Sequence, residues 1–159
     1  MHIRRANTRD LDQIRRLFSD TVRFVNFRDY DLEQIRIWAA GSENIDRWKS
    51  RIAEQYFLIA EKEQMMVGFA SMTDEGYVDL MYVHHEHQGK GIGTVLLGNL
   101  EEFAERIDKK ALSADVSITA RPFFEKRGFG VIKIQSREIK DITFSIYMMT
   151  KALKTKAEV

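Results

Sequence analysis

The sequence contains no cysteine, which excludes disulfide bonds, thiolate metal sites and a cysteine nucleophile. It has a single proline and few clusters of glycine and serine, so flexible linkers and low-complexity tracts are not expected. No apolar run approaches the ~18 residues that a membrane-spanning helix needs, and the polar start Met1-His2-Ile3-Arg4-Arg5 does not resemble a signal sequence. These absences predict a cytoplasmic protein without a membrane partner.

The sequence also has no large excess of one charge, because it contains 25 basic and 24 acidic residues. Proteins that bind nucleic acids usually carry a net positive field, so we expect no nucleic-acid partner. A length of 159 residues with 44% hydrophobic composition suits one folded unit with its own core. We therefore expect a single domain over residues 1–153 and a frayed tail over 154–159.

What the sequence does have is a glycine-rich turn between a strand-like run and an amphipathic helix. The strand-like run is Tyr77–Val83, and the turn reads Gln88-Gly89-Lys90-Gly91-Ile92-Gly93-Thr94. Glycines allow a tight turn and a close approach to a ligand, and the amides that open a helix attract phosphate. The turn predicts a phosphate or pyrophosphate cradle, with a plain tight turn as the alternative.

Two common phosphate-binding motifs do not match this turn. A Walker loop requires Ser or Thr after Gly-Lys, but Lys90 is followed by Gly91. The dinucleotide-binding motif begins directly after a strand, whereas these glycines follow a polar stretch of about five residues.

The pattern Gln-x-x-Gly-x-Gly beginning at Gln88 is followed about thirty residues later by Ala120-Arg121-Pro122-Phe123-Phe124-Glu125-Lys126-Arg127-Gly128-Phe129. With both motifs in this order, the chain resembles the GCN5-related N-acetyltransferase (GNAT) superfamily. The resemblance implies an enzyme that transfers the acetyl group of acetyl-CoA to a primary amine of a small molecule or peptide by direct attack. His84, His85 and His87 before the turn could suggest a metal site, but no carboxylate or thiolate partner stands at ligand spacing, so no metal is expected. A monomer or a homodimer fits equally well.

The hydrophobic periodicity agrees with the fold that this resemblance implies. It predicts a short strand at the N-terminus, three helices, a three-stranded meander, a helix, a strand, a short helix and a closing hairpin. Together with this element order, the resemblance implies an α/β fold class, with a GNAT-like, mostly antiparallel sheet of six or seven strands, a splayed parallel central pair and four to five helices. The splayed pair is formed by the strands at 77–83 and 111–116.

The resemblance also assigns residues to the co-substrate. The strand amides would hold the pantetheine arm and the acetyl oxygen, and the glycine turn would hold the pyrophosphate. One residue just before the later motif and one within it would line the site. These residues are Met81, Tyr82 and Val83; Gln88, Gly89, Lys90, Gly91, Ile92, Gly93 and Thr94; and Ser117 and Phe124.

A carboxylate near the strand is needed to take a proton from the attacking amine. Asp79 is the best candidate, and Tyr77 occupies the position that holds a catalytic Glu in some relatives. Period-two alternation places Tyr77 and Asp79 on the same face of the strand. A structural, ion-paired carboxylate is the alternative for Asp79.

The family pattern places a proton-donating Tyr and an Asn where this chain has Phe124 and Ser117. A phenolic acid at position 124 is therefore ruled out. The loss of this Tyr motivates an alternative function, a non-catalytic acetyl-CoA-binding sensor or interaction module on the same fold.

Overall fold

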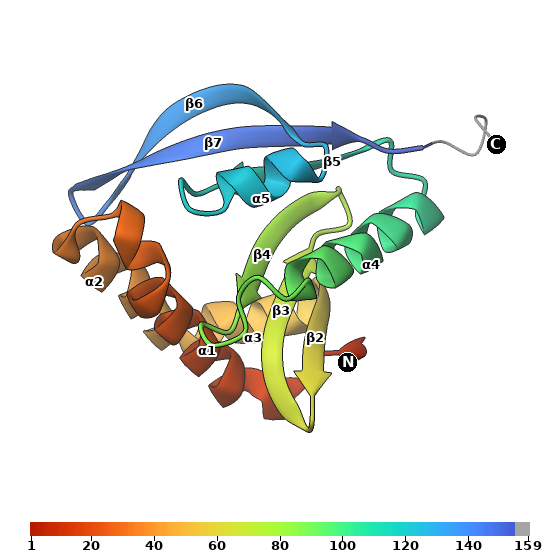
Figure 1. The fold of residues 1–159 in the computed structure, drawn as a ribbon, viewed down its shortest axis with the longest axis horizontal. Coiled ribbons are helices and arrows are strands. Elements are labelled where there is room, and N and C mark those ends of the chain that lie inside the picture. The colour runs from red at the N-terminus through yellow and green to blue at the C-terminus, as the bar shows by residue number, and fades with distance from the viewer. Residues whose placement is uncertain (155–159) are drawn as a thin grey trace.

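The computed structural model describes residues 1–154, and its seven strands form one mixed sheet in the order β1-β2-β3-β4-β5-β7-β6 (Figure 1). The strands are β1 (His2–Arg5), β2 (Tyr56–Lys62), β3 (Met65–Met72), β4 (Tyr77–Val83), β5 (Ala111–Val116), β6 (Gly130–Ile139) and β7 (Ile142–Ala152). Only β4 and β5 pair in parallel among these strands. The predicted fold class is confirmed, whereas residues 155–159 of the expected tail lie outside the described range.

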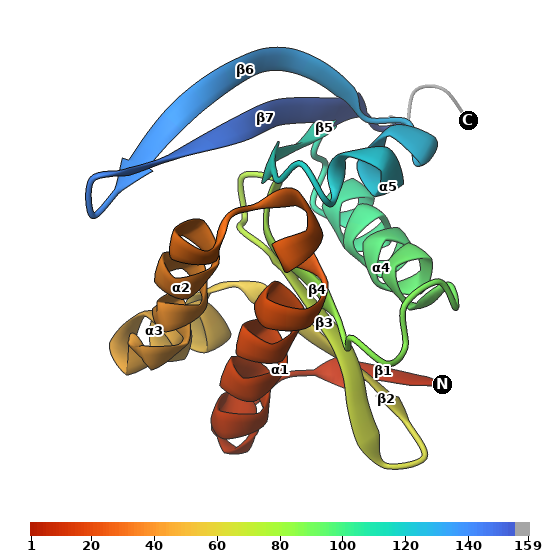
Figure 2. The same cartoon turned by 60° about the vertical axis from the view of Figure 1, so that its left-hand side comes forward.

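Five α-helices flank the sheet within residues 1–154: α1 (Leu11–Phe24), α2 (Leu32–Ala40), α3 (Ile45–Glu54), α4 (Ile92–Arg106) and α5 (Arg121–Lys126). Helices α1, α2 and α3 gather on one side, and α4 and α5 lie on the other (Figure 2). Polar capping residues precede α1 and α2. Asn7 and Asp10 form a capping box before α1, and Asp31 forms one with Gln34 at α2. None of the helices in residues 1–154 is long and apolar enough to span a bilayer.

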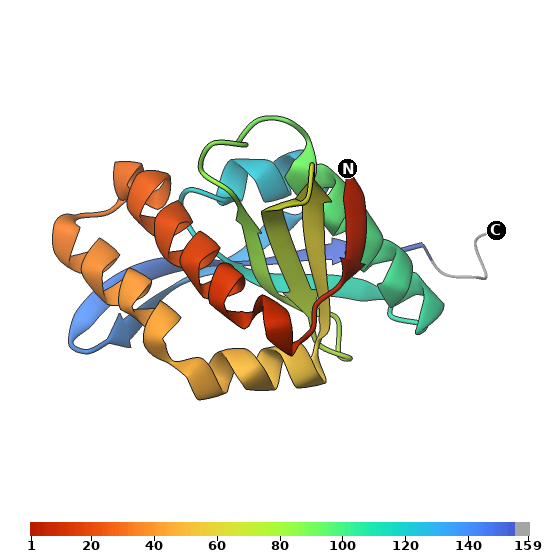
Figure 3. The same cartoon turned by 90° about the horizontal axis from the view of Figure 1, so that it is seen from below.

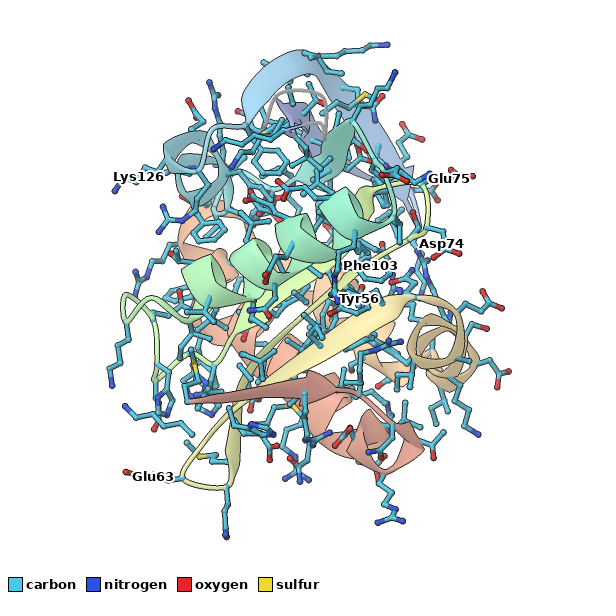
Figure 4. The ribbon with its side chains drawn as sticks, turned by 90° about the vertical axis from the view of Figure 1, so that its right-hand side faces the viewer. Tyr56, Glu63, Asp74, Glu75, Phe103 and Lys126 are labelled. Carbon is cyan, nitrogen blue, oxygen red and sulfur yellow. The ribbon has the colours of Figure 1, made fainter. Side chains whose placement is uncertain are left out.

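The two groups of helices lie on opposite sides of the sheet (Figure 3). The core accordingly consists of two clusters of buried side chains, one with α4 and α5 and one with α1, α2 and α3. On one face, Leu96, Leu97 and Leu100 of α4 are buried against strand residues. Tyr56 of β2 and Phe103 of α4 stack at the edge of this cluster, with ring centroids 3.8 Å apart (Figure 4). The other cluster includes Ile14 of α1 and the fully buried Trp48 of α3. Side chains from helices therefore pack on both faces of the sheet that contains β4 and β5.

The parallel pair of β4 and β5 is short. Only Tyr77 and Val78 of β4 are paired with β5, opposite Ser113 and Ala114. Beyond Val78 the two strands separate, so one edge of β4 is free of β5 over its remaining length. The splayed pair that the sequence predicted is confirmed.

A β-bulge at Asp79 changes which face of the sheet the following side chains of β4 occupy. Val78 pairs with Met72 and Leu80 with Ser71, so Asp79 is the extra residue. Val78 consequently packs in the cluster with α4, while Leu80 and Tyr82 pack in the cluster with α1 and α3. Simple alternation would have placed these three residues on one face.

Candidate active site

A cavity of about 370 Å³ lies where β4 and β5 separate. Its walls come from β4, the glycine turn, the start of α4, the end of β5, α5 and the end of α1 with the residues that follow. Twelve of the fourteen predicted site residues line it: Asp79, Met81, Tyr82, Val83, Gln88, Gly89, Gly91, Ile92, Gly93, Thr94, Ser117 and Phe124. The other two, Tyr77 and Lys90, are not among the lining residues.

The glycine turn forms one end of this cavity. Gly91 is the N-cap of α4, with φ of 83° in the left-handed region, and no side chain caps the helix. The first amides of α4 are therefore available to a ligand. A Cβ atom added at Gly89 or Gly91 would meet no atom within 4 Å, so the backbone here faces open space.

Arg127 adds a positive charge beside this turn, and no sequence pattern had selected it as a site residue. Its Nε atom donates to Thr94 Oγ1 at 3.0 Å, and its guanidinium lies 4.7 Å from the centroid of the Phe123 ring. Phe123 in turn packs against Gly93, where an added Cβ would lie 3.0 Å from the ring. Helix α5 therefore closes over the start of α4.

The free edge of β4 offers backbone amides to the cavity. The His84 amide donates to Val67 O of β3, so antiparallel alternation directs the Tyr82 amide to β3 and the Met81 and Val83 amides away from it. The Val83 carbonyl confirms this direction, because it accepts from Thr21 Oγ1 at 3.1 Å and Gln88 Nε2 at 2.7 Å. Tyr82 therefore lines the cavity through atoms other than its backbone amide nitrogen.

Asp79 lies at the other end of the cavity, fixed by α3 and the residue that follows it. Its Oδ2 atom accepts from Arg51 Nε and Gln55 Nε2, both at 2.9 Å. Gln55 is oriented by Ser71, whose Oγ donates to Gln55 Oε1 at 2.6 Å. Burial lowers the pKa of Arg51, and the charge of Asp79 opposes that change. The side chain of Asp79 keeps 16% exposure, so a small group can still reach it.

A second carboxylate, Asp115 of β5, also lines the cavity and was missed by the sequence analysis. Its Oδ2 atom accepts from Tyr77 OH at 3.2 Å and from Arg137 Nη2 at 2.8 Å. Burial and the charges of Asp115 and Asp79 raise the pKa of Tyr77 to about 12. Tyr77 therefore keeps its proton near neutral pH and acts as a hydrogen-bond donor to Asp115.

Phe124 is 3% exposed and packs edge-on against Phe123 and Phe129. It touches the cavity only as part of the apolar wall. Tyr82 is the one phenol among the lining residues of the described chain, and desolvation raises its pKa to about 12. Its ring packs against Phe18 and Phe69 at centroid distances of 5.0 and 5.5 Å.

Three histidines precede the glycine turn: the His84 and His85 rings stack 4.6 Å apart, and His87 meets His84 edge-on at 5.2 Å. Burial and the neighbouring His85 and His87 lower the pKa of His84. Residues 1–154 contain no group of three or more His, Asp or Glu side chains placed to hold a metal ion. Glu75, a further carboxylate close to β4 in sequence, is exposed in the turn before that strand (Figure 4) and is not among the residues that line the cavity.

Comparison with known proteins decides the family. Residues 26–152 match the model of the acetyltransferase (GNAT) domain. YafP of Escherichia coli (strain K12), an uncharacterised N-acetyltransferase, is 32% identical over 149 residues, which cover 94% of each chain. This chain belongs to the GNAT acetyltransferase family. It is accordingly an acetyl-CoA-dependent N-acetyltransferase, and the enzyme class implied by the resemblance is confirmed.

Two solved structures of GNAT proteins extend the likeness. The GCN5-related N-acetyltransferase from Rhodopseudomonas palustris has a TM-score of 0.92 at 29% identity, covering 96% of this chain and 95% of that one. The PaiA N-acetyltransferase from Thermoplasma acidophilum, solved in complex with coenzyme A, has a TM-score of 0.77 at 19% identity, with 95% and 98% covered. The second likeness concerns the fold alone.

Proposed function

We propose that this enzyme acetylates a primary amine of a small molecule or peptide, and that the amine attacks acetyl-CoA directly in the cavity between β4 and β5. The observation that carries the proposal is the polarity of this cavity. Uncapped backbone of the glycine turn lies at one end, and the carboxylates of Asp79 and Asp115 lie at the other. The first end suits phosphates and the second suits an amine.

The residues present fit acetyl-CoA. The open backbone at Gly89 and Gly91 and the first amides of α4 would hold the pyrophosphate, with Lys90 and Arg127 as nearby cations. The amides of Met81 and Val83 would donate to carbonyl oxygens along the free edge of β4. When bound, acetyl-CoA supplies an activated acetyl group to this edge. Ser117 and Phe124 would line the same channel from β5 and α5.

We assign Asp79 as the general base that accepts a proton from the amine. Two donors already bind its Oδ2 atom, which fixes the carboxylate and leaves Oδ1 to accept a proton from the amine or from an intervening water. Asp115, which lines the cavity, accepts a hydrogen bond from Tyr77, which lies outside the lining. In this assignment Tyr77 is a positioning residue, because its hydroxyl orients Asp115.

Protonation of the departing thiolate cannot use residue 124, since phenylalanine has no acidic proton. Tyr82 keeps its proton because its pKa is raised to about 12, and it lines the cavity. Tyr82 or solvent water is thus the remaining proton source.

The proposed function is tested by incubating the protein with acetyl-CoA and a panel of primary amines that includes diamines, amino acids, amino sugars and short peptides. Amine-dependent release of free thiol, with the acetylated product confirmed by mass spectrometry, supports the proposal. Hydrolysis of acetyl-CoA at a rate that no amine changes would contradict it.

A further inference from the structure

Asn26 is a buried polar residue in the cavity wall that neither the fold nor the proposed chemistry uses. It opens the short 3-10 helix Asn26–Asp29, directly after α1, and is 5% exposed. Its Oδ1 atom is fully buried and has no hydrogen-bond partner among the described residues. An unpaired amide in such a place lowers stability, so its presence calls for a partner that comes from outside the chain.

Thr21 provides a comparison in the same wall. It is also 5% exposed and lines the cavity, but its Oγ1 atom donates to the Val83 carbonyl at 3.1 Å. The polar group of Thr21 is thus used within the protein, whereas that of Asn26 is not. The difference shows that burial in this wall does not by itself prevent hydrogen bonding.

The segment that carries Asn26 is fastened across the cavity to the loop after β5. Tyr30 OH accepts from the Ile118 amide at 2.9 Å, and Thr119 Oγ1 donates to Asp29 Oδ2 at 2.7 Å. These contacts join the α1–α2 connection to the far strand of the separated pair. Asn26 is therefore held in place beside the channel, as a binding residue needs to be.

We propose that Asn26 binds a secondary amide of the pantetheine arm of acetyl-CoA, an inference that rests on the proposed function. A ligand with its phosphates at the glycine turn and its acetyl group near Asp79 has this arm in the middle of the cavity. Each secondary amide of the arm has one N–H donor and one carbonyl acceptor. The Asn26 side-chain amide complements both, because a half-turn about χ2 exchanges Oδ1 and Nδ2 at nearly constant shape.

The test compares coenzyme A with adenosine 3′,5′-bisphosphate, which lacks the pantetheine arm, by calorimetric titration. For Asn26→Ala we expect about tenfold weaker binding of coenzyme A, because one buried hydrogen bond is lost, and unchanged binding of the bisphosphate. Asn99→Ala, on the outer part of α4 and away from the cavity lining, serves as the matched control and leaves both affinities unchanged.

Thermal unfolding of the ligand-free protein gives a second readout that does not depend on binding. Asn26→Leu replaces the unpaired amide with an apolar side chain of similar shape, so the midpoint should rise by about 2–4 °C. Thr21→Val removes a satisfied hydrogen bond and should lower the midpoint. A purely structural role for Asn26 predicts a fall in both variants.

Coenzyme A affinity within twofold of the wild type in both Asn26 variants would overturn the inference, even if the Michaelis constant for the amine rose. An equal loss for coenzyme A and the bisphosphate would also overturn it, because the effect would then not involve the arm. If the wild-type protein binds neither ligand, the proposed function itself fails, and this result is distinct from the other two.

Discussion

Asp79 and Asp115 face the same cavity, but their hydrogen-bond partners differ in kind. Asp79 is held by Gln55 and by Arg51, whose side chain is 14% exposed, whereas Asp115 pairs with Arg137, whose side chain is 46% exposed. If Asp79 takes the proton of the amine, Asp79→Asn should lower kcat/KM by about a hundredfold or more and leave acetyl-CoA affinity unchanged. Asp115→Asn should have a smaller effect. Steady-state kinetics and calorimetry check both variants, and a larger loss in Asp115→Asn would exchange the two roles.

Tyr77 provides a test of the electrostatics around these carboxylates. Its pKa is raised to about 12 by burial and by Asp115 and Asp79, above the usual value of 10.0. The protonated phenol therefore stabilises the folded state fully below pH 10, and this contribution is lost as the pH rises from 10 towards 12. Ultraviolet titration should show a phenolate step near pH 12 that weakens in Tyr77→Phe. An unchanged titration in that variant would show that Tyr77 does not ionise there.

Helix α4 contains two glycines with opposite requirements. Gly98 is exposed, and an added Cβ would meet no atom within 4 Å, so Gly98→Ala should stabilise the fold by about 0.5–1 kcal/mol. Gly93 is buried, and an added Cβ would lie 3.0 Å from the Phe123 ring. Gly93→Ala should therefore lower stability and weaken acetyl-CoA binding, since the start of α4 and α5 must move apart. Urea unfolding of both variants would contradict this account if Gly93→Ala proved the more stable.

The start of α1 depends on Asp10, which is 7% exposed. Arg4 donates to both of its carboxylate oxygens, at 2.7 and 2.8 Å, and the Asn7 amide donates to Oδ2 at 2.8 Å. The Arg4 hydrogen bonds hold the pKa of Asp10 below its usual 3.8. Its stabilising effect is therefore present above pH 3.8 and is lost as the pH falls through the lower folded-state value.

Asp10→Asn should consequently reduce the free energy of unfolding by about 2 kcal/mol at neutral pH, and by less in acid. Equilibrium unfolding between pH 7 and pH 3 checks this difference. A constant penalty over that range would show that the charge of Asp10 contributes nothing.

Across the molecule, the parts of the site that were predictable are those where residues close in sequence act together. The Gln88–Thr94 turn, the Asp79 position and the helix at Pro122 each have a local pattern. Asp115 and Asn26 belong to no local sequence pattern. They line the cavity only because β4 and β5 separate and because α1 packs beside them. The bulge at Asp79 likewise arises from pairing with β3. The sequence of β4 alone therefore does not predict that the side chains after Asp79 change faces.

The cavity that opens where β4 and β5 separate is the feature on which the proposed function depends, and acetyl-CoA binding tests it most directly. Calorimetric titration would compare the wild type with Gly91→Glu, which adds a negative side chain to the open backbone of the glycine turn, and with Gly98→Glu, which adds the same charge farther along α4. The account predicts binding by the wild type and Gly98→Glu and loss of binding by a folded Gly91→Glu. Equal affinity in all three proteins would contradict the placement of the phosphates at this turn.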